Sequence, residues 1–315
     1  AGTVDLRLDY SGAFAEPGQA AAPGAGYDLR LSPRQLKIVP RDLPCAFTLD
    51  GGTIRITPHS LRAVDLSARR GDGVVRVGIE GDLAGNERWK MSLVADRVEL
   101  DDELRRALPG GVGRLIDAMD LRGRLSLDFP TVLYSTQTDR LDVKGRIGLS
   151  GGSMDLGVPL TRIEGRVEME GTTAGGRLER CEGAIRAEAF DLAGRSGKDF
   201  RADLLRPVGR DAVQLSNIQA ELAGGTLAGQ IDMAWPERGP ARFAMQAVLR
   251  EADVQSLSQD NDHTPKGVLT ASLAMEGAWG DPGSRRGRGD VLLVGKDLYR
   301  IPILVGLLQI ANLSL

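Results

Sequence analysis

The chain has 315 residues, and 42% of them are hydrophobic, which is enough for a folded core and too apolar for a disordered protein. Aromatic residues make up only 4%, whereas glycine occurs 41 times, a composition typical of many short strands and turns. The formal net charge of -3 argues against a nucleic-acid surface, which needs clustered Lys and Arg. The basic run RRGRG at 285–289 is the exception, and because glycine splits it we expect a solvated turn there.

Apolar and polar residues alternate from the first residues onward. In AGTVDLRLDYSG, Val4, Leu6 and Leu8 already read as the middle of a strand and no leader sequence precedes them, so we interpret the chain as a segment of a longer protein. Later segments repeat this alternation between Gly, Pro or Asp boundaries, as strands with one buried face do. The pattern predicts strands at 27–32, 52–58, 74–83, 88–100, 123–129, 141–150, 161–170, 183–194, 217–224, 225–235, 241–250 and 267–279.

The segments follow one another closely enough for antiparallel neighbours without crossover helices. We therefore predict an all-β fold, an elongated curved antiparallel β-meander (a repeating β-groove) with a few short helices. Glycines in and between the strands supply the bulges and turns that curl such a sheet. We expect residues 1–315 to form a single segment with a sub-boundary near residue 120. A β-sandwich, in which two such sheets cover each other, is the alternative.

A curled meander has the shape of a trough, and the alternation indicates which side chains form its floor. Residues at every second position of a strand point to the same face, and we call this shared position their parity. The parity of the opposite, charged face belongs to Arg76, Arg166, Glu168 and Glu170. The residues predicted to line the apolar groove are Val75, Val77, Ile79, Ile147, Leu149, Ile163, Val167, Met169, Ile231, Met233, Met245 and Leu273.

Three stretches break the strand pattern and predict helices. Residues 101–119 begin with Asp101 or Asp102 as a helix cap, and residues 252–259 form one short helical piece. These pieces either cap the trough or serve as surface connectors. The third helix, at 301–311, has Pro302 in its first turn, a position that suits proline. It is too short for a confident membrane span, so packing on the sheet and docking at a membrane surface stay open, with Ile301, Ile303, Leu304, Leu307 and Leu308 as its apolar residues.

Residues that could carry out chemistry are sparse and scattered. Cys45 and Cys181 belong to no metal-ligand spacing, and we favour two isolated, half-buried thiols over a long-range disulfide. His59 and His263 lie in turn-like contexts without a partner at the spacing of a metal site or a catalytic triad. Acidic pairs are best explained as solvated strand edges. We therefore expect no catalytic residues, no metal and no cofactor, and a protein that is not an enzyme.

Three segments, in their order along the chain, carry a resemblance to a known family. They are PLTRIEGRV at 159–167, AELAGGTLAGQI at 220–231 and RGRGDVLLVGKDLYRIPIL at 286–304. Together they resemble the C-terminal region of AsmA-like proteins, relatives of TamB and YdbH-type envelope proteins, over most of the chain from about residue 27. None of the three is a catalytic signature.

The resemblance implies a β-groove that carries phospholipid acyl chains across the periplasm of a double-membrane bacterium and supports outer-membrane biogenesis. It implies a full-length protein anchored in the inner membrane, with both membranes reached through regions outside this segment, and possible envelope protein partners. The alternative is a structural β-sandwich or solenoid that acts as an envelope scaffold or adhesin. A carbohydrate-active protein is least favoured, because its cleft would need paired carboxylates and exposed aromatic residues.

Overall fold

We describe the protein from a computed structural model. Strands make up 82% of the described residues. The structure describes residues 2–11, 26–40, 45–83, 88–107, 116–117, 119–155, 158–175, 177–206, 212–234, 239–258, 266–279 and 281–295.

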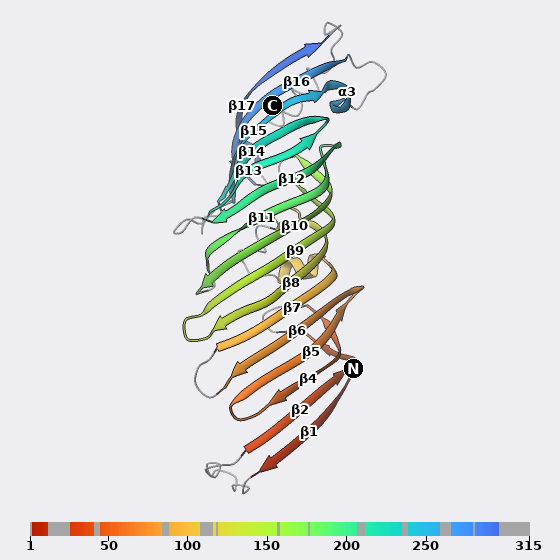
Figure 1. Ribbon diagram of the computed structural model, residues 1–315, viewed down its shortest axis with the longest axis vertical. Helices are drawn as coiled ribbons and strands as arrows, with labels where there is room; N and C mark the ends of the chain where they lie inside the picture. Colours follow the sequence, from red (N-terminus) through yellow and green to blue (C-terminus); the bar gives the residue numbers. More distant parts are fainter. Residues whose placement is uncertain are drawn as a thin grey trace. The chain divides into compact units, whose positions relative to one another are not determined.

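The described part of the chain forms seventeen strands and short helices (Figure 1). The strands are β1 (Thr3–Ser11), β2 (Gly26–Arg34), β3 (Leu36–Ile38), β4 (Phe47–Ile56), β5 (Ser60–Arg70), β6 (Gly73–Asp82), β7 (Arg88–Glu99), β8 (Arg122–Ser135), β9 (Arg140–Asp155), β10 (Pro159–Ala174), β11 (Arg177–Leu192), β12 (Arg195–Arg206), β13 (Ala212–Leu222), β14 (Gly225–Ala234), β15 (Arg242–Asp253), β16 (Gly267–Ala278) and β17 (Asp281–Gly295). The helices are α1 (Asp102–Ala107) and α3 (Val254–Leu257).

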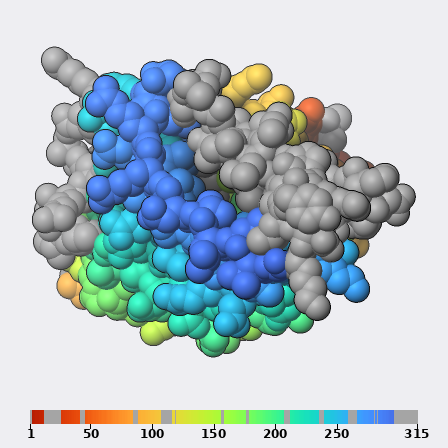
Figure 2. Space-filling model, turned by 90° about the horizontal axis from the view of Figure 1, so that it is seen from above, coloured from red at the N-terminus to blue at the C-terminus, as the bar shows by residue number. Residues whose placement is uncertain are grey.

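Neighbouring strands along the chain pair antiparallel, and the sheet that they form is not closed. β2 and the short β3 both pair with β4, and β17 pairs with β16. In Figure 2, β17 (blue) crosses the front of the molecule with no described strand over it. The predicted all-β antiparallel meander with short helices is therefore confirmed. Since the described strands belong to one sheet, no second sheet of described residues covers it, and the sandwich alternative is not the fold.

The chain divides into two compact units, which we describe separately. The N-terminal unit comprises Ala1–Ala107, Leu125–Ile147 and Glu170–Leu178. The C-terminal unit comprises Leu108–Arg124, Gly148–Met169 and Glu179–Leu315. Strands β8 to β11 therefore contribute residues to both units. The proposed sub-boundary near residue 120 stays a prediction.

Two of the predicted helical segments contain short helices among the described residues: α1 and residues 116–117 in the segment 101–119, and α3 in the segment 252–259. In the segment 101–119 the cap is Asp101, whose Oδ1 accepts a hydrogen bond from the Leu104 N–H at 2.8 Å. In the segment 252–259 the helix is the single turn α3, capped by Asp253, which accepts from the Ser256 N–H at 2.9 Å. The predicted helix at 301–311 lies outside the described residues.

The expectation of a turn at 285–289 was wrong, because these residues lie inside β17. The glycines of this run face the neighbouring strand without breaking the pairing: Gly287 lies opposite Met275 and Gly289 opposite Leu273. Charge and glycine content indicated a turn, but the cross-strand partners on β16 hold this stretch extended.

Bulges interrupt several strands at polar residues with positive φ. Asp65 (φ 53), Asn217 (φ 52) and Glu251 (φ 57) each lie at a break in the register between neighbouring strands. Such a left-handed residue costs free energy, and Asp and Asn tolerate it best. A bulge bends its strand and increases the local twist, so these residues contribute to the curvature of the strands.

Candidate functional site: the apolar face of the sheet

The strand register of the N-terminal unit places its predicted groove residues on one face. Directly opposite residues of an antiparallel pair point to the same side of the sheet. Val77 lies opposite Leu66 on β5 and Leu93 on β7. Its strand neighbours are paired in the same way: Val75 lies opposite Ala68 and Ala95, and Ile79 lies opposite Ala63 and Met91.

This apolar face continues to the first strands of the unit. Leu31 of β2 lies opposite Leu6 of β1 and Ile54 of β4, and Leu29 is paired with Leu8 and Ile56. Leu6 and Leu8 are 65% and 56% exposed. Exposed leucines on a face made of apolar residues indicate that the described residues leave this end of the face uncovered.

The C-terminal unit has its own apolar face. Ile231 of β14 lies opposite Leu215 of β13 and Met245 of β15, and Met245 lies opposite Met275 of β16. Met233 lies opposite Val213 and Phe243, and Leu273 lies opposite Ala247.

Two clusters of buried side chains lie on this second face. We name them after their phenylalanines. The Phe243 cluster contains Val213, Met233, Phe243 and Trp279, with Met119, Ile231 and Met245 among the partly buried residues packed against it. The Phe190 cluster contains Phe190, Ala220 and Leu222, with Leu227 and Leu249 among those packed against it.

The remaining predicted lining residues lie on β9 and β10. In the N-terminal unit, Ile147 has the same parity as Gly145, which lies against the buried Phe129. In the C-terminal unit, a Cβ built at Gly152 would lie 2.5 Å from Leu149 Cδ2 and 3.1 Å from Ile163 Cβ, so these two side chains are neighbours.

Val167 and Met169 share the parity of Gly165, which lies against Ala187 of the apolar face. The structure thus groups Val75, Val77, Ile79 and Ile147 in one unit and Leu149, Ile163, Val167, Met169, Ile231, Met233, Met245 and Leu273 in the other. Contact of any of them with lipid stays a prediction.

Glycines show which way the sheet of the C-terminal unit bends. Gly183, Gly225, Gly229 and Gly289 all have the parity of the apolar face. A Cβ built at any of them would lie within 3.0 Å of a carbonyl oxygen on the neighbouring strand, closer than real Cβ atoms come. Backbone atoms of neighbouring strands come this close to one another on the side toward which a sheet curves. We therefore infer that the apolar face of this unit is concave.

The N-terminal unit shows the same contrast between its faces. Gly145 and Gly73 have apolar-face parity, and a Cβ built at either would meet neighbouring backbone within 3.0 Å. Gly78 has the opposite parity, and the nearest backbone atom to its built Cβ is the Ala63 oxygen at 4.0 Å. Backbone crowding is therefore confined to the apolar side at these positions.

The other face carries charged residues, many of them in ion pairs. Asp28 accepts hydrogen bonds from Arg55 at 2.9 Å and from Arg30 at 3.1 Å. These bonds, that from Arg55 first, lower the pKa of Asp28 to about 2. Lys198 and Glu221 form a similar exposed pair at 3.2 Å in the C-terminal unit. Exposed pairs contribute little stability, and their main effect is to keep this face solvated.

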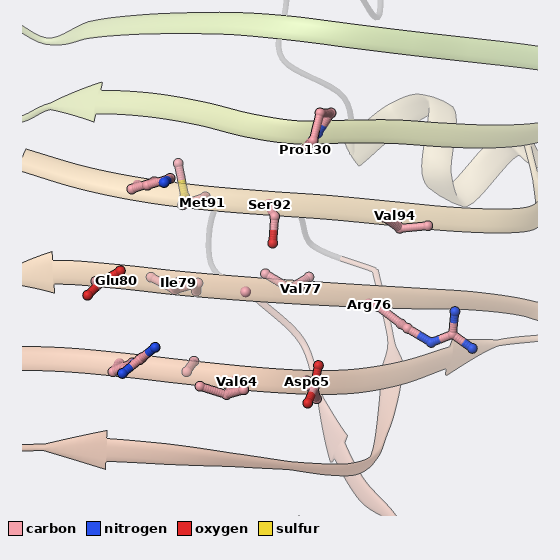
Figure 3. Close-up of a pocket in the computed structure, with 14 residues that line it drawn as sticks. Val64, Asp65, Arg76, Val77, Ile79, Glu80, Met91, Ser92, Val94 and Pro130 are labelled. Atoms are coloured by element: carbon pink, nitrogen blue, oxygen red, sulfur yellow. The ribbon is translucent and has the colours of Figure 1, made fainter.

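A depression of about 410 Å³ lies on the charged face of the N-terminal unit. It forms where Gly78 lacks a side chain, opposite Ser92. Figure 3 shows Arg76 and Glu80 pointing toward opposite ends of the depression, with Pro130 on the adjoining strand. Its charged residues, Arg62, Asp65, Arg76, Glu80 and Lys90, are of both signs. This depression was not predicted from the sequence. Its only signal in the sequence is Gly78 between the β-branched residues Val77 and Ile79 of β6.

Chemistry-bearing residues do not converge in the described part of the chain. No group of three or more His, Cys, Asp or Glu side chains there could hold a metal ion. His59 is exposed in the turn before β5, and His263 lies outside the described residues. Among the described residues, no helix is both long and apolar enough to cross a membrane.

Both cysteines are free thiols, in different units. They are more buried than the sequence suggested, with Cys45 at 0% exposed and Cys181 at 4%. Burial raises the pKa of the Cys181 thiol, although the nearby Arg206 acts in the opposite direction. A buried thiol with a raised pKa is a poor nucleophile, so Cys181 behaves as a small apolar core residue.

The comparisons with known proteins identify no relative. No family model, no curated protein and no solved structure matches this chain. The resemblance to AsmA-like proteins therefore rests on the three sequence segments named above, and the function has to be argued from the apolar face.

Proposed function

We propose that this protein is a non-enzymatic lipid carrier that holds phospholipid acyl chains along the apolar face of its sheet. The single observation that carries the proposal is the apolar face that continues from strand to strand in each unit, with no second sheet of described residues over it and with Leu6 and Leu8 exposed at its β1 end. The opposite face is charged and solvated. An open face of this kind provides a continuous apolar surface and no reactive group, which suits binding and sliding without chemistry.

The energetics favour an acyl chain as the occupant. Each CH₂ removed from water contributes about 0.8 kcal/mol, so a 16-carbon chain buried over half of its surface gains roughly 6 kcal/mol. Part of this gain is offset by the chain's lost freedom. Because the apolar side chains repeat along the face, successive positions offer similar free energies. A lipid can then move along the face without a deep minimum, its headgroup remaining in water.

The sequence resemblance supports the wider setting of this proposal. It favours phospholipid transport across the periplasm of a double-membrane bacterium, in support of outer-membrane biogenesis. Contacts with the inner and outer membranes would be made by regions outside this segment, and envelope proteins are candidate partners. A scaffold or adhesin with the same sheet would need no lipid, which makes lipid binding the property that separates the two functions.

Photo-crosslinking tests the proposal on both units. A photoreactive amino acid is placed at Val77 or Met245 on the apolar face, and at the adjacent Arg76 or Gln246 on the charged face as matched controls. The purified variants are irradiated with vesicles of phosphatidylethanolamine and phosphatidylglycerol. We expect lipid adducts at Val77 and Met245 only. Equal labelling at all four positions would contradict binding along the apolar face, and no labelling at any would favour the scaffold.

A further inference from the structure

Methionine is concentrated in the C-terminal unit. Of the 7 methionines in the chain, Met91 belongs to the N-terminal unit, and those of the C-terminal unit are Met119, Met154, Met169, Met233, Met245 and Met275. Several of them meet at the Phe243 cluster, where Met233 is buried and Met119, Met245 and Met275 pack against it partly buried. The paired residues around Val77 in the other unit are mainly Val, Leu, Ile and Ala. The two apolar faces therefore differ in chemistry, because thioether sulfur, which can be oxidised, gathers on the second one.

Met245 and Met275 are both adjacent and accessible. They lie directly opposite each other on β15 and β16, a pairing that places Cβ atoms about 4.5–5.5 Å apart. Ile231 on β14 lies opposite Met245 and completes the row across the three strands. Both methionines are half-buried, whereas Met233 on the same face is 9% exposed. A small solute can therefore reach these two side chains, on the face along which an acyl chain is proposed to lie.

We propose that Met245 and Met275 form an oxidation site, and that conversion of their thioethers to sulfoxides by a peroxide lowers the affinity of the apolar face for acyl lipid. This inference rests on the proposed function and adds to it a means of releasing the lipid. The lone pair of the sulfur forms an S–O bond with one oxygen of hydrogen peroxide as the O–O bond breaks. The other oxygen leaves as hydroxide and takes the proton of the first to become water. Sulfur loses two electrons, which reduce the peroxide.

A sulfoxide changes the character of the face. A thioether is apolar and flexible, whereas the sulfoxide oxygen is a hydrogen-bond acceptor. Against an acyl chain this oxygen loses its hydrogen bonds to water, which disfavours the bound state. Because Met245 and Met275 are cross-strand neighbours, their two sulfoxides interrupt the apolar row at one place. A methionine sulfoxide reductase reverses the step: two thiols become a disulfide, and the oxygen leaves as water.

The test measures oxidation and lipid loading on the same samples. The chain is treated with hydrogen peroxide, the excess is removed with catalase, and sulfoxides are located by peptide mass spectrometry. We expect Met245 and Met275 to be oxidised roughly fivefold faster than the more buried Met233. After incubation with vesicles of phosphatidylethanolamine and phosphatidylglycerol, the treated chain should carry about fivefold less lipid than the untreated chain. Circular dichroism should show it still folded, and methionine sulfoxide reductase should restore the loading.

Two variants assign the effect to this pair. In Met245→Leu/Met275→Leu both side chains keep a similar volume and peroxide does not oxidise them. Compared with its own untreated sample, this double variant should lose less than about twofold of its lipid on treatment. Met91→Leu is the matched control in the other unit, and treatment should lower its loading as much as that of the unmodified chain. An equal loss in the double variant, or undiminished loading of the unmodified chain after both sulfurs are oxidised, would overturn the inference.

The outcomes also separate this inference from the proposed function. An untreated chain that loads no lipid would overturn the proposed function, whereas the failures above leave lipid binding intact. If the fully oxidised chain unfolds, the initial oxidation rates still provide a test. Vesicles with saturated chains, which peroxide does not attack, should slow the oxidation of Met245 and Met275 at low conversion. Equal rates with and without vesicles would show that no acyl chain covers these sulfurs and would refute the oxidation site as a control on lipid binding.

Discussion

A carboxylate introduced on the apolar face of the C-terminal unit should cost very different amounts of stability at Val167 and at Met233. Both residues have the apolar parity of their strands, and alternation alone predicts that an open groove tolerates Asp at either one. The structure separates them. Val167 is half-buried on β10, whereas Met233 is 9% exposed and packs in the Phe243 cluster.

The magnitudes follow from this difference in burial. Full burial of a Val side chain contributes about 1.5–3 kcal/mol, so Val167→Asp loses roughly 1 kcal/mol of transfer free energy and up to about 1 kcal/mol of strand propensity. Its carboxylate can still reach water. Met233→Asp loses about 2–5 kcal/mol for the deleted side chain, and several kcal/mol more for a carboxylate buried without a partner. That sum approaches the whole stability of a domain, about 5–15 kcal/mol.

Urea unfolding monitored by circular dichroism measures both effects in the same unit. We expect a small decrease in the midpoint for Val167→Asp and a large decrease or an unfolded protein for Met233→Asp. Met233→Ala serves as the milder variant, with an expected loss of about 2–5 kcal/mol. Arg166→Asp, on the charged face beside Val167, is the control and should change stability by less than about 1 kcal/mol.

Two results would refute this reasoning. A loss of several kcal/mol at Val167 would show that something covers the face at β10. A loss at Met233 as small as that at Val167 would show that the Phe243 cluster is not packed. In a lipid-binding assay, Val167→Asp should bind less lipid although it remains folded, because the charge lies where the acyl chain is proposed to rest.

Three further predictions concern pH, glycine packing and thiol reactivity. Pairing with arginine lowers the pKa of Asp28 to about 2, below its unfolded value near 4, so the stability that Asp28 contributes should be complete above about pH 4 and lost as the pH falls toward 2. The difference in unfolding free energy between the unmodified chain and Asp28→Asn should therefore shrink over this pH range. A difference that stays constant would contradict the prediction. Gly229→Ala places a Cβ against the Gln246 carbonyl oxygen and should lower the free energy of unfolding by about 1–3 kcal/mol in the same urea assay. Gly283→Ala is its control, because the nearest contact of the new Cβ is 3.4 Å away, and it should lower the free energy of unfolding by less than about 1 kcal/mol. Cys45 and Cys181 should react with iodoacetamide slowly in the folded protein and rapidly in denaturant, as followed by mass spectrometry, and rapid labelling of the folded chain would contradict their burial.

Much of the fold could be predicted from the sequence because alternation is a local property. A strand of period two sends Val75, Val77 and Ile79 to one side and Arg76 to the other whatever its neighbours are. Gly and Asp at the segment ends mark where turns can form, and short connections favour antiparallel pairing. The meander and the identity of its apolar face follow from these local rules.

Burial and hydrogen-bond satisfaction were decided only by the tertiary structure. Val167 and Met233 are equivalent in alternation, but Met233 is covered because Phe243 and Trp279 come to it from other strands. Among the described residues the buried Trp279 donor has no acceptor, which no local pattern reveals. The strand at 285–289 likewise depends on pairing with β16, which overrides the turn tendency of its glycines. The period of a strand sets the direction of each side chain, whereas its burial and its partners depend on residues that are distant in sequence and adjacent only after folding.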